Sequence, residues 1–160
     1  MHQTGRFALL FLIATLALGF VQFFIHWKAL FAIRRPLGVW TFLYALSHAA
    51  IWLLLDQGGL WDIALAEMVT MAHVQLGLAA LLLLLPLALT SVDMAPRLLV
   101  YPLWKKLHVL VWPAATVAMI HVWVVSRFQN PQVTGLTIVV ILLMMSRLYA
   151  ARKLHKRDAQ

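Results

Sequence analysis

The chain has 160 residues, of which 64% are hydrophobic and 11% are charged, and its mean hydropathy is +0.89. Because a soluble globular domain carries about 25% charged residues, this composition excludes a water-soluble fold and predicts a membrane protein. The absence of cysteine excludes disulfides, thiolate metal sites and thiol catalysis. The length favours a single domain over residues 1–160.

Five apolar segments approach the roughly 20 residues that a membrane-spanning helix needs, the last of them being short. In chain order the spans are predicted over residues 7–25, 36–55, 68–89, 103–125 and 133–146. The first lacks the short apolar core and small-residue cleavage site of a removable signal peptide, so we expect it to remain as a span. The sequence therefore predicts an all-α, five-helix transmembrane bundle with a basic tail over residues 147–160.

The basic residues predict the orientation of the bundle. Eleven of the 13 lysines and arginines fall on one side of a five-span topology, in the gaps after the first and third spans and in the tail. Such residues mark the cytoplasmic side, so the amino terminus is predicted to face outward and the carboxyl terminus inward. The opposite gap, residues 56–67, carries three acidic residues and no basic one. The net charge of +8 thus indicates topology and attraction to membrane lipids, and no nucleic acid is expected as a partner.

Three histidines, His48, His108 and His121, lie inside apolar segments, where a polar side chain indicates a functional site or a hydrogen bond between helices. At ~1.5 Å per residue, His48 lies roughly 20 Å beyond Arg35 and His121 roughly 22 Å beyond Lys106. These two therefore share a depth toward the outer side, whereas His108 follows Lys106 closely. The spacing predicts one site between His48 and His121 and a second site near His108.

The kind of ligand favours haem over zinc. Zinc sites use three or four protein ligands, often with carboxylate or thiolate, and the predicted spans contain neither group. Two imidazoles facing each other across a bundle suit the two axial positions of a haem iron, and with both positions filled electron transfer is the natural task. His108 and His121 would lie roughly 140° apart around an ideal helix. Pro113, between them, is expected to kink the helix or change its winding.

Four motifs occur in order along the chain: TGRFALLFLIATL (4–16), RRPLGVWTFLYALSH (34–48), LALTS (87–91) and WKKLHVLVWPAATVAMIHVW (104–123). Together they resemble the MsrQ (YedZ) family, haem-binding membrane subunits of the bacterial MsrPQ methionine sulfoxide reductase system, within the ferric-reductase-like transmembrane group. The resemblance implies an inner-membrane protein with haem b, one or two per chain, and His48, His108 and His121 as ligands. It implies electron flow to a periplasmic molybdopterin enzyme that repairs oxidised methionine. The family usually has six spans, and the chain begins at the segment that follows the family's first.

The second ligand of the inner haem has two candidates. Arg34 matches a basic family position and, with Arg35, is expected to contact haem propionates or to approach the iron. His26 is the competing ligand. The sequence contains no nicotinamide or flavin domain, so quinol or a cytosolic flavin reductase is expected as electron donor, with FMN or quinone as a further cofactor.

The chain is thus expected to serve as an electron-transfer subunit of an oxidoreductase. Two alternatives stay open at this point. One is a haem electron carrier for a different periplasmic enzyme. The other is a structural or assembly subunit of a larger membrane complex.

Overall fold

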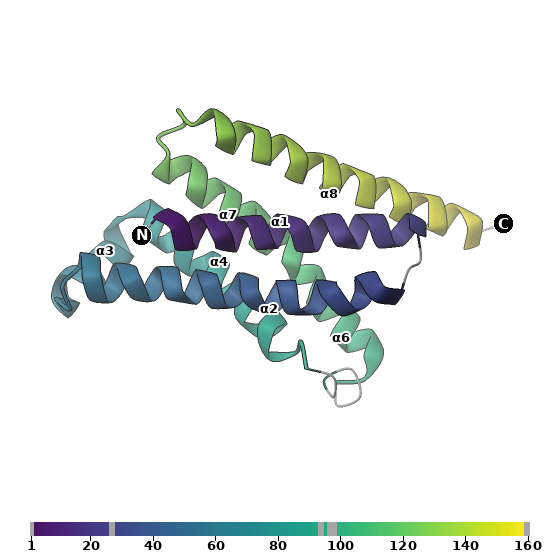
Figure 1. Ribbon diagram of the computed structural model, residues 1–160, viewed down its shortest axis with the longest axis horizontal. Helices are drawn as coiled ribbons and strands as arrows, with labels where there is room; N and C mark the ends of the chain where they lie inside the picture. The colour runs from purple at the N-terminus through teal and green to yellow at the C-terminus, as the bar shows by residue number, and fades with distance from the viewer. Residues whose placement is uncertain (1, 26–27, 93–94, 96–98, 159–160) are drawn as a thin grey trace.

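The regular elements of the computed structural model are all helical within the residues that it describes, 2–25, 28–92, 95 and 99–158 (Figure 1). The elements are α1 (His2–Ile25), α2 (Lys28–Ile51), a π-helical turn (Trp52–Asp56), α3 (Trp61–Thr70), α4 (Ala72–Leu89), α6 (Tyr101–Leu107), a 3₁₀ turn (His108–Leu110), α7 (Val111–Val125) and α8 (Pro131–Asp158). The segments long and apolar enough to cross a membrane are Gln3–Gln22, Ala32–Asp56, Ala72–Leu89, Tyr101–Val125 and Pro131–Tyr149. The predicted all-α, five-span architecture is confirmed, while the orientation of the termini stays a prediction.

Two helices extend well beyond the predicted spans. α2 begins at Lys28 and runs through Pro36, which had been expected to start the second span. An interior proline removes one backbone hydrogen bond and crowds the carbonyl four residues earlier, which usually kinks or breaks a helix, but α2 continues past Pro36. α8 continues from the fifth span to Asp158, so the helical backbone includes most of the predicted basic tail. The hydropathy of the sequence therefore indicates which part of a helix spans the membrane, but it does not indicate the residues at which the helix begins and ends.

A short helix, α3, occupies most of the gap predicted over residues 56–67. Asp62 lies in its first turn, where a carboxylate interacts favourably with the helix dipole. Gln57 Nε2 donates a hydrogen bond to Glu67 Oε2 at 2.7 Å. The backbone leaves the helical region at Met71 (φ −97°, ψ 110°), so the third span begins at Ala72 and not at residue 68. The acidic residues that identified this gap therefore belong to a folded segment.

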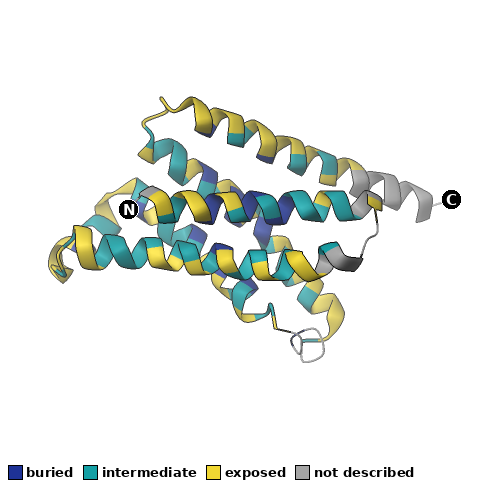
Figure 2. Ribbon diagram, in the orientation of Figure 1, coloured by how far each residue is buried: buried dark blue, intermediate teal, exposed yellow. Residues whose placement is uncertain are grey.

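α1 lies at the centre of the packing, as the dark-blue stretch along it shows (Figure 2). One buried cluster joins α1 to α4 and α7 and consists of Leu12, Leu16, Leu84, Leu87, Val111, Ala114 and Ala115. A second joins α1 to α7 and α8 and consists of Leu9, Ile13, Met119, Val133 and Val140. Small side chains at a helix contact allow close approach, and this packing fixes α4 and α7 beside each other.

Ala114 offers a direct test of this contact because its side chain is 0% exposed. Adding bulk to a tightly packed position typically costs about 1–3 kcal/mol. We therefore expect Ala114→Leu to lower the midpoint of thermal unfolding in detergent. Ala66→Leu, at an exposed position of α3, should leave the midpoint unchanged. Equal midpoints for the two variants would contradict the packing described.

Candidate functional site

His48 on α2 and His121 on α7 meet near the end of the bundle that carries α3, called here the α3 end. The centroids of their imidazole rings lie 6.4 Å apart, and the ring planes make an angle of 75°. The structure thus brings together the two histidines that the sequence predicts at the same depth in the membrane.

This separation fits a single metal ion between the rings. Bonds from metal ions to imidazole nitrogen are about 2.0–2.1 Å long and a ring centroid lies about 1.1 Å beyond the nitrogen, so opposed ligands have centroids about 6.3 Å apart. Two imidazoles that hold one ion do not need to be coplanar, so an angle of 75° between the planes is compatible with this arrangement. A haem would bring the porphyrin ligands of its own iron, and His48 and His121 are the residues that would hold it.

A backbone carbonyl holds His121 in the protonation form that a metal ligand needs. His121 Nδ1 lies 2.7 Å from the carbonyl oxygen of His73. A carbonyl only accepts hydrogen bonds, so Nδ1 carries the proton and Nε2 keeps a lone pair. Metal-binding histidines usually donate their second N–H in this way. His73 therefore orients the imidazole of His121 through its backbone carbonyl. The sequence alone did not indicate this hydrogen bond.

Gly77 gives His121 the room to reach that carbonyl. A Cβ atom at position 77 would lie 3.1 Å from His121 Cε1 and 3.2 Å from its Nδ1. Gly77 is one helical turn after His73 on α4, so any side chain there would stand beside the hydrogen bond between His121 and His73. We infer that Gly77 is part of the site.

The amino-terminal motif TGR covers His48 in a similar way. A Cβ atom on Gly5 would lie 3.2 Å from His48 Cε1. Thr4 Oγ1 lies 3.5 Å from His48 Nδ1. Both residues belong to the first turns of α1, so the family-like motif at the start of the chain has a structural role beside a candidate haem ligand.

His108 lies at the opposite end, called here the basic end because it carries Arg34, Arg35, Lys105, Lys106 and Arg147. Its Nδ1 lies 3.1 Å from the carbonyl oxygen of Trp104, and its ring centroid lies 4.2 Å from that of Trp104. As at His121, a carbonyl partner for Nδ1 leaves the lone pair on Nε2.

The helix changes its winding between His108 and His121, as expected near Pro113. The residues before this proline form the 3₁₀ turn His108–Leu110, and α7 starts anew at Val111 with Pro113 in its first turn. A proline ring clashes with the carbonyl four residues earlier, which explains where the regular α-helix is interrupted.

Two cavities at the basic end share Arg34 and His108. The smaller, of about 120 Å³, lies between α1, α2 and α4 and is also lined by Arg35. The larger, of about 210 Å³, lies between α1 and α8 and is closed by α6 and the start of α7. Among the described residues His108 is the one imidazole lining either cavity. His26, the predicted alternative ligand, lies outside the described residues.

Comparison with known proteins agrees with this arrangement. Residues 4–120 match the family described as ferric reductase like transmembrane component. The fold and the paired histidines therefore belong to a ferric-reductase-like membrane protein.

The more similar relatives are named protein-methionine-sulfoxide reductase heme-binding subunit MsrQ. That of Xanthomonas oryzae pv. oryzae (strain MAFF 311018) is 36% identical over 143 residues, which are 88% of this chain and 65% of the relative. That of Herminiimonas arsenicoxydans is 32% identical over 162 residues, or 99% of this chain and 74% of the relative. The chain belongs to the MsrQ family, as its motifs predicted. It spans a little under two thirds of the Xanthomonas oryzae relative, and no solved structure matches it.

Proposed function

We propose that the chain is a membrane subunit that binds haem b between His48 and His121 and passes electrons toward the α3 end. The 6.4 Å approach of the two rings carries this proposal. Membership of the MsrQ family supports it, since the relatives are named as heme-binding subunits of a methionine-sulfoxide reductase.

The protein's residues would set the behaviour of the bound haem. When present, haem supplies a reversible one-electron couple whose potential depends on its axial ligands, hydrogen bonds and burial. His48 and His121 would fill both axial positions, so small ligands such as oxygen would have no site. The carbonyl of His73 would make His121 a more basic ligand, which favours the oxidised iron.

A second haem is proposed at the basic end, with His108 as its ligand. The carbonyl of Trp104 orients the ring, and Arg34 and Arg35 line the adjoining smaller cavity, where they would contact propionates. Electrons would enter at this end from quinol or from a cytosolic flavin reductase, with FMN or quinone as possible carriers. They would leave at the α3 end to a periplasmic molybdopterin reductase of protein methionine sulfoxide.

Haem content tests both sites. The protein purified in detergent from haem-replete cells is expected to show sharp b-type bands in its reduced-minus-oxidised absorption spectrum. We expect His108→Ala to halve the haem per chain while retaining b-type bands from the other site. A colourless preparation of the unmodified protein would favour a structural or assembly subunit and would overturn the proposal. Unchanged haem content in His108→Ala would refute the second haem alone.

A further inference from the structure

Helix α3 lies at the end of the bundle, between the end of α2 and the start of α4 (Figure 1). Residues four apart form rows along a helix, and one such row of α3 packs inward. It carries Ala64, which is 1% exposed, and the half-buried Met68. The adjacent row joins Ile63 to Glu67, whose carboxylate accepts the hydrogen bond from Gln57. These two rows attach α3 to the bundle and leave the others open.

The other two rows of α3 are exposed and differ in chemistry. One row is apolar and consists of Trp61, Leu65 and Val69, which are 59%, 58% and 76% exposed. The next row around the helix is also exposed and consists of Asp62, Ala66 and Thr70. With 3.6 residues per turn, the two rows point in directions about 100° apart. An apolar row beside a polar one is the pattern of a helix that lies at the boundary between hydrocarbon and water.

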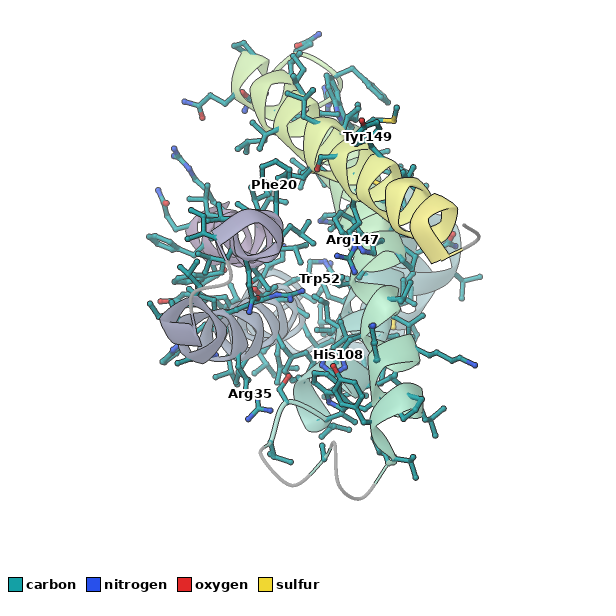
Figure 3. All side chains as sticks on the ribbon, turned by 90° about the vertical axis from the view of Figure 1, so that its right-hand side faces the viewer. Phe20, Arg35, Trp52, His108, Arg147 and Tyr149 are labelled. Carbon is teal, nitrogen blue, oxygen red and sulfur yellow. The ribbon has the colours of Figure 1, made fainter. Side chains whose placement is uncertain are left out.

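The apolar row continues the lipid-facing surface of the second span. Leu54 and Leu55, at the end of the segment Ala32–Asp56, are 56% and 73% exposed, and Leu60 just before α3 is exposed as well. Trp52 of the same π-helical turn is less exposed, and Figure 3, viewed from the basic end, shows it on the inner side of α2. Exposed apolar side chains therefore extend from the end of α2 through Leu60 into α3.

The charges near α3 favour a neutral membrane surface. Residues 36–96 contain no lysine or arginine, whereas Asp56 and Asp62 are exposed. Many interfacial helices combine burial of apolar surface with attraction between basic side chains and anionic lipid, and α3 has no basic side chain for the second contribution. It does have Trp61, and tryptophan is enriched at membrane–water boundaries. Zwitterionic lipid is the partner that buries the apolar row without repelling the carboxylates.

We propose that α3 is an interfacial helix that places Trp61, Leu65 and Val69 among the neutral headgroups and upper acyl chains of the leaflet at the α3 end. Asp62 and Thr70 then face water. Contact with the lipid fixes the depth of the end of α2 and of the start of α4 in the bilayer. This assignment does not depend on haem binding, because it rests on the exposed surface of α3 alone.

Nitroxide spin labels test the placement of α3, because the chain contains no cysteine and each single-cysteine variant carries one label. Leu65→Cys and Ala66→Cys form a matched pair in the middle of the two exposed rows. In phosphatidylcholine vesicles, we expect the label at position 65 to collide more with oxygen, which concentrates in hydrocarbon, than with a water-soluble nickel chelate. The label at position 66 should show the reverse preference. Power-saturation electron paramagnetic resonance measures both collision rates.

Three further variants serve as repeats and as a reference. Val69→Cys and Thr70→Cys repeat the comparison one turn along α3, so that the test stands if a first variant fails to fold. Leu142→Cys, at an exposed position within the segment Pro131–Tyr149, gives the ratio for a label inside the bilayer. Replacing part of the phosphatidylcholine by phosphatidylglycerol should not raise the oxygen-to-nickel ratio at position 65. A rise would overturn the assignment to neutral lipid.

The two label positions also separate the competing placements of α3. A preference for the nickel chelate at both positions 65 and 66 would place the apolar row in water, as expected of a surface that binds a protein, and would overturn the lipid contact. A preference for oxygen at both would place all of α3 inside the bilayer and overturn its position at the boundary. The expected pattern in a protein without haem bands would leave this assignment standing and refute only the proposed function.

Discussion

His48→Ala and His121→Ala are each expected to abolish haem binding at the α3 end. Either change removes one of the two imidazoles whose rings lie 6.4 Å apart, so His48 and His121 could no longer hold the iron together. Each variant should therefore lose the b-type absorption of that haem and keep only what the basic end contributes. Reduced-minus-oxidised spectra with haem quantified per chain provide the measurement.

His73→Ala is the matched control for this pair. His73 is a third histidine near the same rings, but the atom that accepts the hydrogen bond from His121 is its backbone carbonyl oxygen, which alanine retains. We expect this variant to keep full haem content. Retention of the band in His121→Ala together with its loss in His73→Ala would show that the imidazole of position 73, and not that of position 121, binds the iron.

Gly77→Ala is expected to weaken haem binding at the same end without removing any ligand. The added Cβ would stand 3.2 Å from His121 Nδ1 and would push the ring from the His73 carbonyl. Loss of such a supporting hydrogen bond typically costs about 10- to 100-fold in metal affinity. We expect low haem occupancy and, in the fraction that binds, a raised reduction potential, because the axial ligand becomes less basic.

Gly135→Ala is the control that distinguishes a contact with His121 from a general effect of replacing glycine by alanine in a helix. Gly135 lies in α8 with no atom within 4 Å of a Cβ built on it. Both changes improve helix propensity by about 1 kcal/mol, so only the contact with His121 distinguishes them. Identical haem content and potential in the two variants would show that position 77 has no part in holding the ligand.

The pairing of His48 with His121 was predictable because a membrane imposes a simple geometry. Each span crosses as a helix with a fixed rise per residue, and basic residues mark a common reference plane. Distance from that plane was enough to place two residues on different helices at one depth. Which helices would be neighbours did not follow from this reasoning, and the packing around Ala114 and Ala115 settled it.

The supporting groups could not be predicted in the same way. The role of Gly77 depends on which side chain of another helix approaches it. The residues next to Gly77 in the sequence do not indicate that this side chain is His121. The break at Met71 lies within a stretch that has no charged residue after Glu67, so hydropathy placed the start of the third span too early. Arg34 was predicted to contact haem propionates or to approach the iron, whereas Arg147 was predicted only as part of the basic tail. That both residues line one cavity depends on the path of α8.

Electron paramagnetic resonance of the oxidised protein tests most directly whether one iron ion is held by both His48 and His121. Because the two ring planes are nearly perpendicular, at 75°, we predict a low-spin ferric signal of the strongly anisotropic kind that crossed axial imidazoles produce. This signal should vanish in both His48→Ala and His121→Ala. A high-spin haem at this end of the unmodified protein, or survival of this strongly anisotropic signal in either variant, would contradict the shared coordination.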